Sequence, residues 1–183
     1  MTNTITADQL KELLQIQKDF DSRIPTLNLQ DSKVAYVVEF FEWFNTLETF
    51  KNWKKNPGKP LDVQLDELAD MLAFGLSIAN QLHNFEETYE NIIENVKNAY
   101  NDTGHVRDAY NDTGHVRDAY HCMLDICSDV YHDWSTSEDY VSLPFSLAKR
   151  FYSIDQLITA YKKKMRFNHA RQDGTADTDK GYI

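Results

Sequence analysis

Two pairs of acidic residues, each with a spacing of three, are the residues of this chain best suited to chemistry. The pairs are Glu39 with Glu42 and Glu67 with Asp70. Residues three apart lie on one face of a helix, so each pair presents two carboxylates side by side. Apolar residues surround both pairs, and several ionised carboxylates buried together lose hydration and repel one another. The acids are therefore expected either to take up protons or to be compensated by a cation.

A metal ion is the expected cation, because neither segment carries an arginine or lysine in its interior beside the acids. Hard carboxylate oxygens suit Mg²⁺ or Mn²⁺, and Mg²⁺ commonly meets phosphate groups in proteins. A di-iron bundle would need Glu-x-x-His motifs, and neither Glu39 nor Glu67 has a histidine three residues on. The alternative is two solvated acid pairs, which are commonplace where 29 of 183 residues are acidic.

Two long apolar helices are expected to position these acids, over residues 33–50 and 61–82. Asp31 or Ser32 is expected to cap the first of them. Apolar side chains fall nearly all round the first helix and on two sides of the second. A helix that is apolar on both sides is buried, so the acids are expected to be at least partly buried too.

The rest of the chain also has helical periodicity. One helix should begin at Thr6, where Gln9 completes a T-x-x-Q capping box. This helix is expected to span about residues 6–22, and further helices about residues 85–100, 115–134, 145–152 and 154–168. The connections are expected at 23–30, at the basic segment 51–60 and at 135–144. Six glycines and four prolines are few for an all-β protein. We therefore predict an all-α helical bundle that forms a single domain over residues 1–183.

The charge balance limits the partners. The formal net charge is −10, which argues against binding a nucleic-acid backbone, since that requires a basic patch. The N-terminal segment lacks an apolar signal core, and no run of about 18 apolar residues occurs. A cytoplasmic protein without membrane contact is expected.

One segment is an exact tandem duplication. Residues 101–110 read NDTGHVRDAY, and residues 111–120 repeat them without a change. Ten residues are far fewer than the 20 to 50 of solenoid repeats. The Asn-Asp-Thr-Gly motif favours turns, so the duplicated segment is expected to be a loop insertion. The polar tail, about residues 172–183, is expected to be mobile.

Four motifs, taken in order, resemble one protein family. They are EFFEW from Glu39, FKNWK from Phe50, ELADMLAF from Glu67 and K-x-x-x-N-x-x-R-Q ending at Gln172. The chain is similar to the dimeric, all-α dUTP diphosphatases, which are relatives of the MazG-type nucleotide pyrophosphohydrolases. It looks most like the members carried by phages, such as staphylococcal phages. The resemblance extends from about Leu10 to Gly174, apart from the duplicated segment.

The resemblance implies roles for particular residues. Both acid pairs match the family's ligands for two or more Mg²⁺ ions, for which Mn²⁺ substitutes. One acid of the first pair would also orient or deprotonate the attacking water, and Glu39 is favoured. The residues expected to bind substrate are Gln17, Asp21, Lys51, Trp53, Lys54, Phe74, Asn80, Tyr161, Lys164, Asn168 and Arg171. The last four share one helical face and are expected to close on sugar and phosphates.

The chain departs from the family pattern at two positions that bear on the base. Asp21 stands where relatives often have Asn, and Ala73 stands where several have His. Both positions affect recognition of the base or deoxyribose, and Asn80 offers a replacement polar contact.

The expected reaction is hydrolysis of dUTP to dUMP and pyrophosphate, with dUDP also accepted, in a homodimer. Attack at the β-phosphorus is implied by the resemblance alone. One alternative is a pyrophosphohydrolase for another nucleotide, such as dCTP or a purine. A second is a binding protein, since phage members of this family can be bound by the repressor of a pathogenicity island.

Overall fold

A computed structural model describes residues 4–82, 88–98 and 137–177 of the chain. These residues form helices and connecting loops and contain no strand, which confirms the all-α fold. The helices are α1 (Ala7–Asp21), α2 (Leu29–Leu47), α3 (Leu61–Leu82), α4 (Thr88–Asn98), α6 (Ser137–Phe151) and α7 (Ile154–Gln172). The helix expected over 115–134 and the duplicated segment lie outside the described residues.

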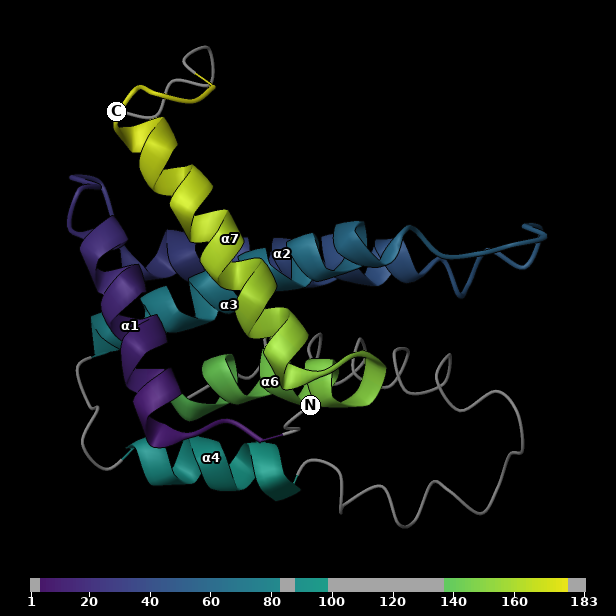
Figure 1. Ribbon diagram of the computed structural model, residues 1–183, viewed down its shortest axis with the longest axis horizontal. Coiled ribbons are helices and arrows are strands. Elements are labelled where there is room, and N and C mark those ends of the chain that lie inside the picture. Colours follow the sequence, from purple (N-terminus) through teal and green to yellow (C-terminus); the bar gives the residue numbers. More distant parts are fainter. Residues whose placement is uncertain (1–3, 83–87, 99–136, 178–183) are drawn as a thin grey trace.

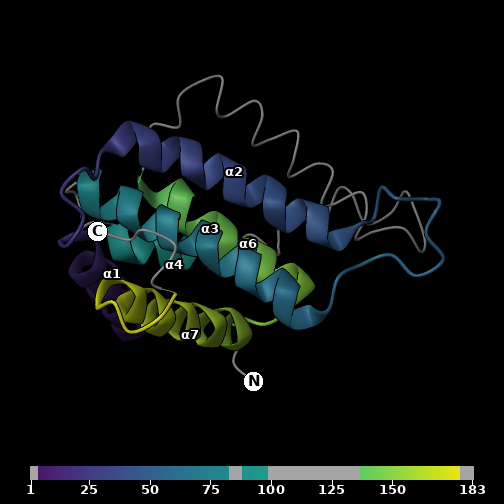
Figure 2. The same cartoon turned by 90° about the horizontal axis from the view of Figure 1, so that it is seen from above.

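α3 is the central helix of the bundle. It packs against α1, α2, α6 and α7, and α4 packs against α6. α2 and α3 run side by side, and α7 crosses over α3 (Figures 1 and 2). The loop that joins α2 to α3 extends beyond the ends of both helices. None of the described helices is long and apolar enough to cross a membrane.

The middle of α3 is buried, as its sequence predicts. Ten of its residues are buried, among them Leu68, Leu72 and Leu76, which are completely so. Gly75 lies where α3 and α6 cross closely: a Cβ atom there would overlap the backbone carbonyl oxygen of Tyr140. Glycine therefore permits this crossing through its small size, while its backbone remains helical.

α2 is buried on one side only, contrary to expectation. Tyr36, Phe40 and Trp43 are fully buried, but Val34, Val38 and Phe41 are exposed. The last three have a spacing of four and then three, so they lie along one face of α2. Among the described residues this face is left open.

Helix boundaries agree with local signals and differ where tertiary packing decides. The capping box of Thr6 and Gln9 is present. α2 is capped by Asn28, rather than by Asp31 or Ser32, and it ends at Leu47 because Glu48 adopts a left-handed conformation with φ of 52°. α6 begins at residue 137, so the loop expected over 135–144 is wrong for most of its length.

The proline inside α6 explains that error. Pro144 lacks a backbone N–H and usually ends or kinks a helix. Here it is buried, and its neighbours Tyr140, Val141 and Phe145 are buried in the core as well. Packing of this face stabilises the helix on both sides of the proline.

Candidate functional site: a carboxylate cluster between α2 and α3

Three of the four acids converge where α2 packs against α3. Glu39 comes from α2, and Glu67 and Asp70 come from successive turns of α3. One carboxylate oxygen from each lies within 4.8 Å of the other two. All three side chains are partly buried. Glu42, which was expected to be partly buried with them, is exposed and lies outside this group of oxygens.

The cluster disfavours its own ionisation. Burial, together with the charges of Asp70, Glu42 and Glu67, raises the pKa of Glu39 to about 7. Burial also raises the pKa values of Glu67 and Asp70, with contributions from neighbouring acids. Protons or cations are therefore held more tightly here than at ordinary surface carboxylates.

One lysine beside the cluster comes from a distant part of the chain. Lys164 of α7 places its Nζ 2.7 Å from Asp66 Oδ2 and 2.5 Å from Asp70 Oδ2. Burial lowers the pKa of Lys164, but Asp70 and Asp66 outweigh burial and raise it. As the sequence indicates, no cation beside the acids comes from the interior of α2 or α3, and α7 supplies this lysine instead.

The donor set fits a divalent metal ion. One ammonium group cannot neutralise three clustered carboxylates, so negative charge remains at the site. Carboxylate oxygens are hard ligands of the kind that Mg²⁺ and Mn²⁺ prefer. Glu39, Glu67 and Asp70 are the residues that would hold the ion.

A second group of predicted residues forms a buried polar network. Gln17 Nε2 donates to Asp21 Oδ1 over 2.8 Å, and Tyr161 Oη donates to Gln17 Oε1 over 3.1 Å. All three residues are buried. Burial raises the pKa of Asp21, although hydrogen bonds from Ser77 and Gln17 act in the opposite direction.

Two further predicted residues lie on α3. Asn80 donates from Nδ2 to the backbone oxygen of Leu14 over 3.1 Å. Phe74 is partly buried and packs against the core. Both therefore help to join α3 to its neighbours.

The basic loop after α2 is organised around a buried acid. Lys54 and Lys51 donate from Nζ to Glu48 Oε1 over 2.6 and 3.2 Å, and the backbone N–H of Gly58 donates to Oε2 over 3.2 Å. The hydrogen bond from Lys54 is the main reason that the pKa of Glu48 falls to about 2. Trp53 lies in the same loop and is 73% exposed.

The four residues expected to grip the phosphates do not share one exposed surface. Tyr161 is fully buried, and Lys164 lies at the carboxylate cluster. Arg171 donates to Asn168 Oδ1 over 3.1 Å and to Asp177 Oδ2 over 2.9 Å. α7 thus contributes one cation to the cluster and a second near the tail.

Comparison with known families decides the identity. The family model described as dUTPase matches residues 9–175, which is most of the chain. The chain belongs to the dUTPase family. Among curated protein sequences no significant match is found.

As a member of the dUTPase family, the chain is a dUTP diphosphatase, a hydrolase of nucleotide metabolism. Enzymes of this family are generally metal-dependent, which agrees with the carboxylate cluster. All the predicted site residues lie within the matched range.

The sequence-based prediction omits two residues that contact the predicted lysines, Asp66 and Glu48. Asp66 was not singled out, although it lies four residues before Asp70 and hence on the same face of α3. Glu48 was also missed. An acid directly after an apolar helix, followed by lysines at 51 and 54, is the signal that points to it.

Proposed function

We propose that this dUTPase hydrolyses dUTP, and also dUDP, at the carboxylate cluster with Mg²⁺, for which Mn²⁺ substitutes. The products from dUTP are dUMP and pyrophosphate. The observation that carries this proposal is the convergence of Glu39, Glu67 and Asp70, whose pKa values are all raised. Carboxylates that repel one another and are only partly offset by a lysine favour a divalent cation.

Each residue of the site has a separate proposed role in hydrolysis. Bound Mg²⁺ would supply Lewis acidity and a more acidic water. Glu39 would also orient or deprotonate the water that attacks the β-phosphorus. Lys164, adjacent to the cluster, would offset negative charge on the phosphate oxygens. Glu42, outside the oxygen group, remains the fourth proposed metal ligand.

Base and sugar recognition is proposed for residues at the end of α1 and in the second half of α3. Gln17 and Asp21 are buried and already hydrogen-bonded, which makes them rigid rather than freely adjustable contacts. Phe74 and Asn80 lie on α3, which packs against α1. Lys51, Trp53 and Lys54 come from the loop after α2, and Asn168 and Arg171 from the end of α7. The tail beyond Gln172 is proposed to close over the substrate.

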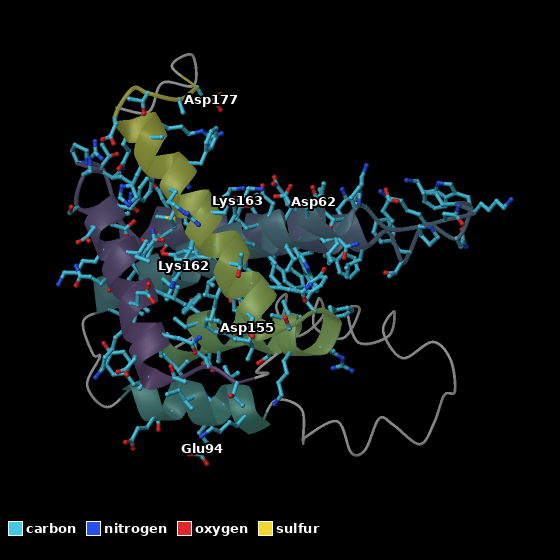
Figure 3. All side chains as sticks on the ribbon, viewed as in Figure 1. Asp62, Glu94, Asp155, Lys162, Lys163 and Asp177 are labelled. Carbon is cyan, nitrogen blue, oxygen red and sulfur yellow. The ribbon has the colours of Figure 1, made fainter. Side chains whose placement is uncertain are left out.

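The decisive test is release of pyrophosphate from dUTP with Mg²⁺ by wild type and by Glu67→Gln. The substitution should lower turnover by at least about a hundredfold, because it removes a charged ligand from the cluster. Glu94→Gln is the matched control. Glu94 is exposed and lies on α4 (Figure 3), whereas the cluster lies on α2 and α3, so this variant should hydrolyse dUTP as wild type does. Equal rates for all three proteins would rule out the metal role.

A panel of triphosphates tests the base. dUTP should be preferred over dCTP and purine nucleotides, and the absence of any preference would contradict the proposed substrate.

We also propose that the chain is a homodimer. The support is the exposed face of α2 formed by Val34, Val38 and Phe41, since contiguous apolar faces favour association. Sedimentation should give twice the mass of one chain, and Val38→Glu should shift the protein towards the monomer. A monomeric wild type would contradict this proposal.

A further inference from the structure

Lys164 forms ion pairs with two carboxylates, of which one belongs to the carboxylate cluster and the other does not. Its Nζ lies 2.7 Å from Asp66 Oδ2 and 2.5 Å from Asp70 Oδ2. Asp70 belongs to the group of oxygens that could hold a metal ion, whereas Asp66 lies outside it. The side chain of Asp66 is 51% exposed, and that of Lys164 is only 16% exposed. The lysine is therefore confined, with its outer partner at the edge of the site.

The two carboxylates are four residues apart on α3 and so lie on the same face of that helix. A cation held by Asp70 and the ammonium group of Lys164 compete for one carboxylate and repel each other. Asp66 does not take part in this competition. It can keep its hydrogen bond to Lys164 while Asp70 is engaged elsewhere.

We propose that Asp66 is a positioning residue that retains Lys164 at the edge of the carboxylate cluster when a divalent cation engages Asp70, so that the ammonium group faces the substrate phosphates. This inference rests on the proposed function of the cluster. Asp66 acts only through Lys164, since its own negative charge would repel a triphosphate. An ammonium group has three donor hydrogens, so Lys164 can keep one on Asp66 and direct the others to phosphate oxygens.

A role of Asp66 in stability alone would look different. Partly exposed ion pairs contribute little to folding, and losing one would leave nucleotide binding unchanged. If Asp66 acted only through its charge, Asp66→Asn would strengthen binding of the anionic nucleotide, because a repelling negative charge would be removed. The positioning role predicts weaker nucleotide binding on removal of a negative charge, which is the opposite sign.

The test is a double-mutant cycle on binding of a non-hydrolysable α,β-imido analogue of dUTP, measured by calorimetry with Mg²⁺ on the full chain. Asp66→Asn should weaken binding by about tenfold, the order expected when a charge-assisted hydrogen bond is lost. In a Lys164→Gln background, Asp66→Asn should have no further effect. Asp66→Glu, which keeps the charge, should recover most of the affinity.

Asp62→Asn is the matched control. Asp62 is exposed and lies one turn before Asp66 on α3 (Figure 3), so the same charge is removed without a partner of Lys164. This variant should bind the analogue as tightly as wild type, or slightly more tightly.

Titration of Mn²⁺ into the chelator-treated protein gives a readout that needs no activity. Lys164→Gln should bind Mn²⁺ several-fold more tightly than wild type, because the competing ammonium group is gone. If wild type fails to bind Mn²⁺, the result contradicts both the proposed function and this inference. If wild type binds Mn²⁺ but Asp66→Asn matches Asp62→Asn, or weakens analogue binding equally in the Lys164→Gln background, this inference alone is overturned.

Discussion

Two glutamates of the α2 region meet opposite surroundings. Glu39, within α2, faces Glu67 and Asp70, and burial with these like charges raises its pKa to about 7. Glu48, directly after α2, accepts hydrogen bonds from two lysines and a backbone N–H, and its pKa falls to about 2. The same side chain is thus destabilised as an anion at one position and stabilised at the other.

The difference separates a carboxylate whose charge is compensated within its own loop from one that we propose to be functional. Glu48 has its partners within its own loop, and it engages Lys51 and Lys54, which were expected to serve the substrate. Among the described residues, Lys164 is the one cation that offsets the three charges of Glu39, Glu67 and Asp70. A fold that leaves such a group undercompensated keeps a site for an external cation.

The largest effect expected from this contrast is on hydrolysis. Glu39→Gln should lower dUTP turnover by at least about a hundredfold, because a metal-binding oxygen and the proposed base are both lost. Glu42→Gln should cost less, about tenfold, because Glu42 is exposed and outside the oxygen group. Steady-state assays at saturating Mg²⁺ measure both. Equal losses of turnover would show that Glu42 contributes as much to hydrolysis as Glu39 does.

The affinity for the cation should depend on pH. Because the pKa of Glu39 is about 7, a cation must displace its proton at lower pH. Displacement of one proton predicts that Mn²⁺ binding weakens by about tenfold from pH 8 to pH 6. Calorimetric titration at the two pH values measures this change. The same affinity at both would show that Glu39 is already ionised at pH 6.

Glu48 should affect stability rather than metal binding. Its pKa is lowered, so its stabilising effect is complete above the ordinary value of 4.5 and is lost as the pH falls through about 2. Glu48→Gln should therefore lower the midpoint of thermal unfolding at pH 7, with a difference from wild type that shrinks in acid. An unchanged midpoint at pH 7 would mean that the lysines around Glu48 contribute nothing to the fold.

A smaller effect of opposite sign is expected at Glu39. Its pKa is raised, so ionisation lowers the stability of the folded protein as the pH rises from about 4.5 to about 7. With chelator at pH 8, Glu39→Gln should raise the free energy of unfolding by about 1 kcal/mol, after allowance for partial exposure. Urea unfolding measures this change, which should vanish near pH 4. A loss of stability at pH 8 would contradict the account of like-charge repulsion.

Local signals in the sequence are enough to predict the bounds of several helices. The Thr6–Gln9 capping box and the apolar periodicity of residues 61–82 predict the start of α1 and the bounds of α3, because both features act between residues close in the chain. The pairing of acids on α2 and α3 likewise predicts which carboxylates can meet. Three of the four do.

Features that depend on how helices cross could not be predicted from the sequence. Lys164 reaches Asp66 and Asp70 only because α7 crosses α3, and Tyr161 reaches Gln17 only because α7 packs against α1. The exposure of Glu42 and Phe41 depends on which side of α2 packs against α3. The helix through Pro144 depends on burial of its neighbours, which no local signal reports.

The most direct test of the central claim is a titration of Mn²⁺ at pH 8 into wild type, Glu67→Gln and Glu48→Gln. Each variant removes one glutamate charge, but only Glu67 lies in the cluster. We expect Glu67→Gln to bind at least about tenfold more weakly than wild type, and Glu48→Gln to bind as wild type does. Equal affinities for all three proteins would contradict the assignment of the cluster as the metal site of this dUTPase.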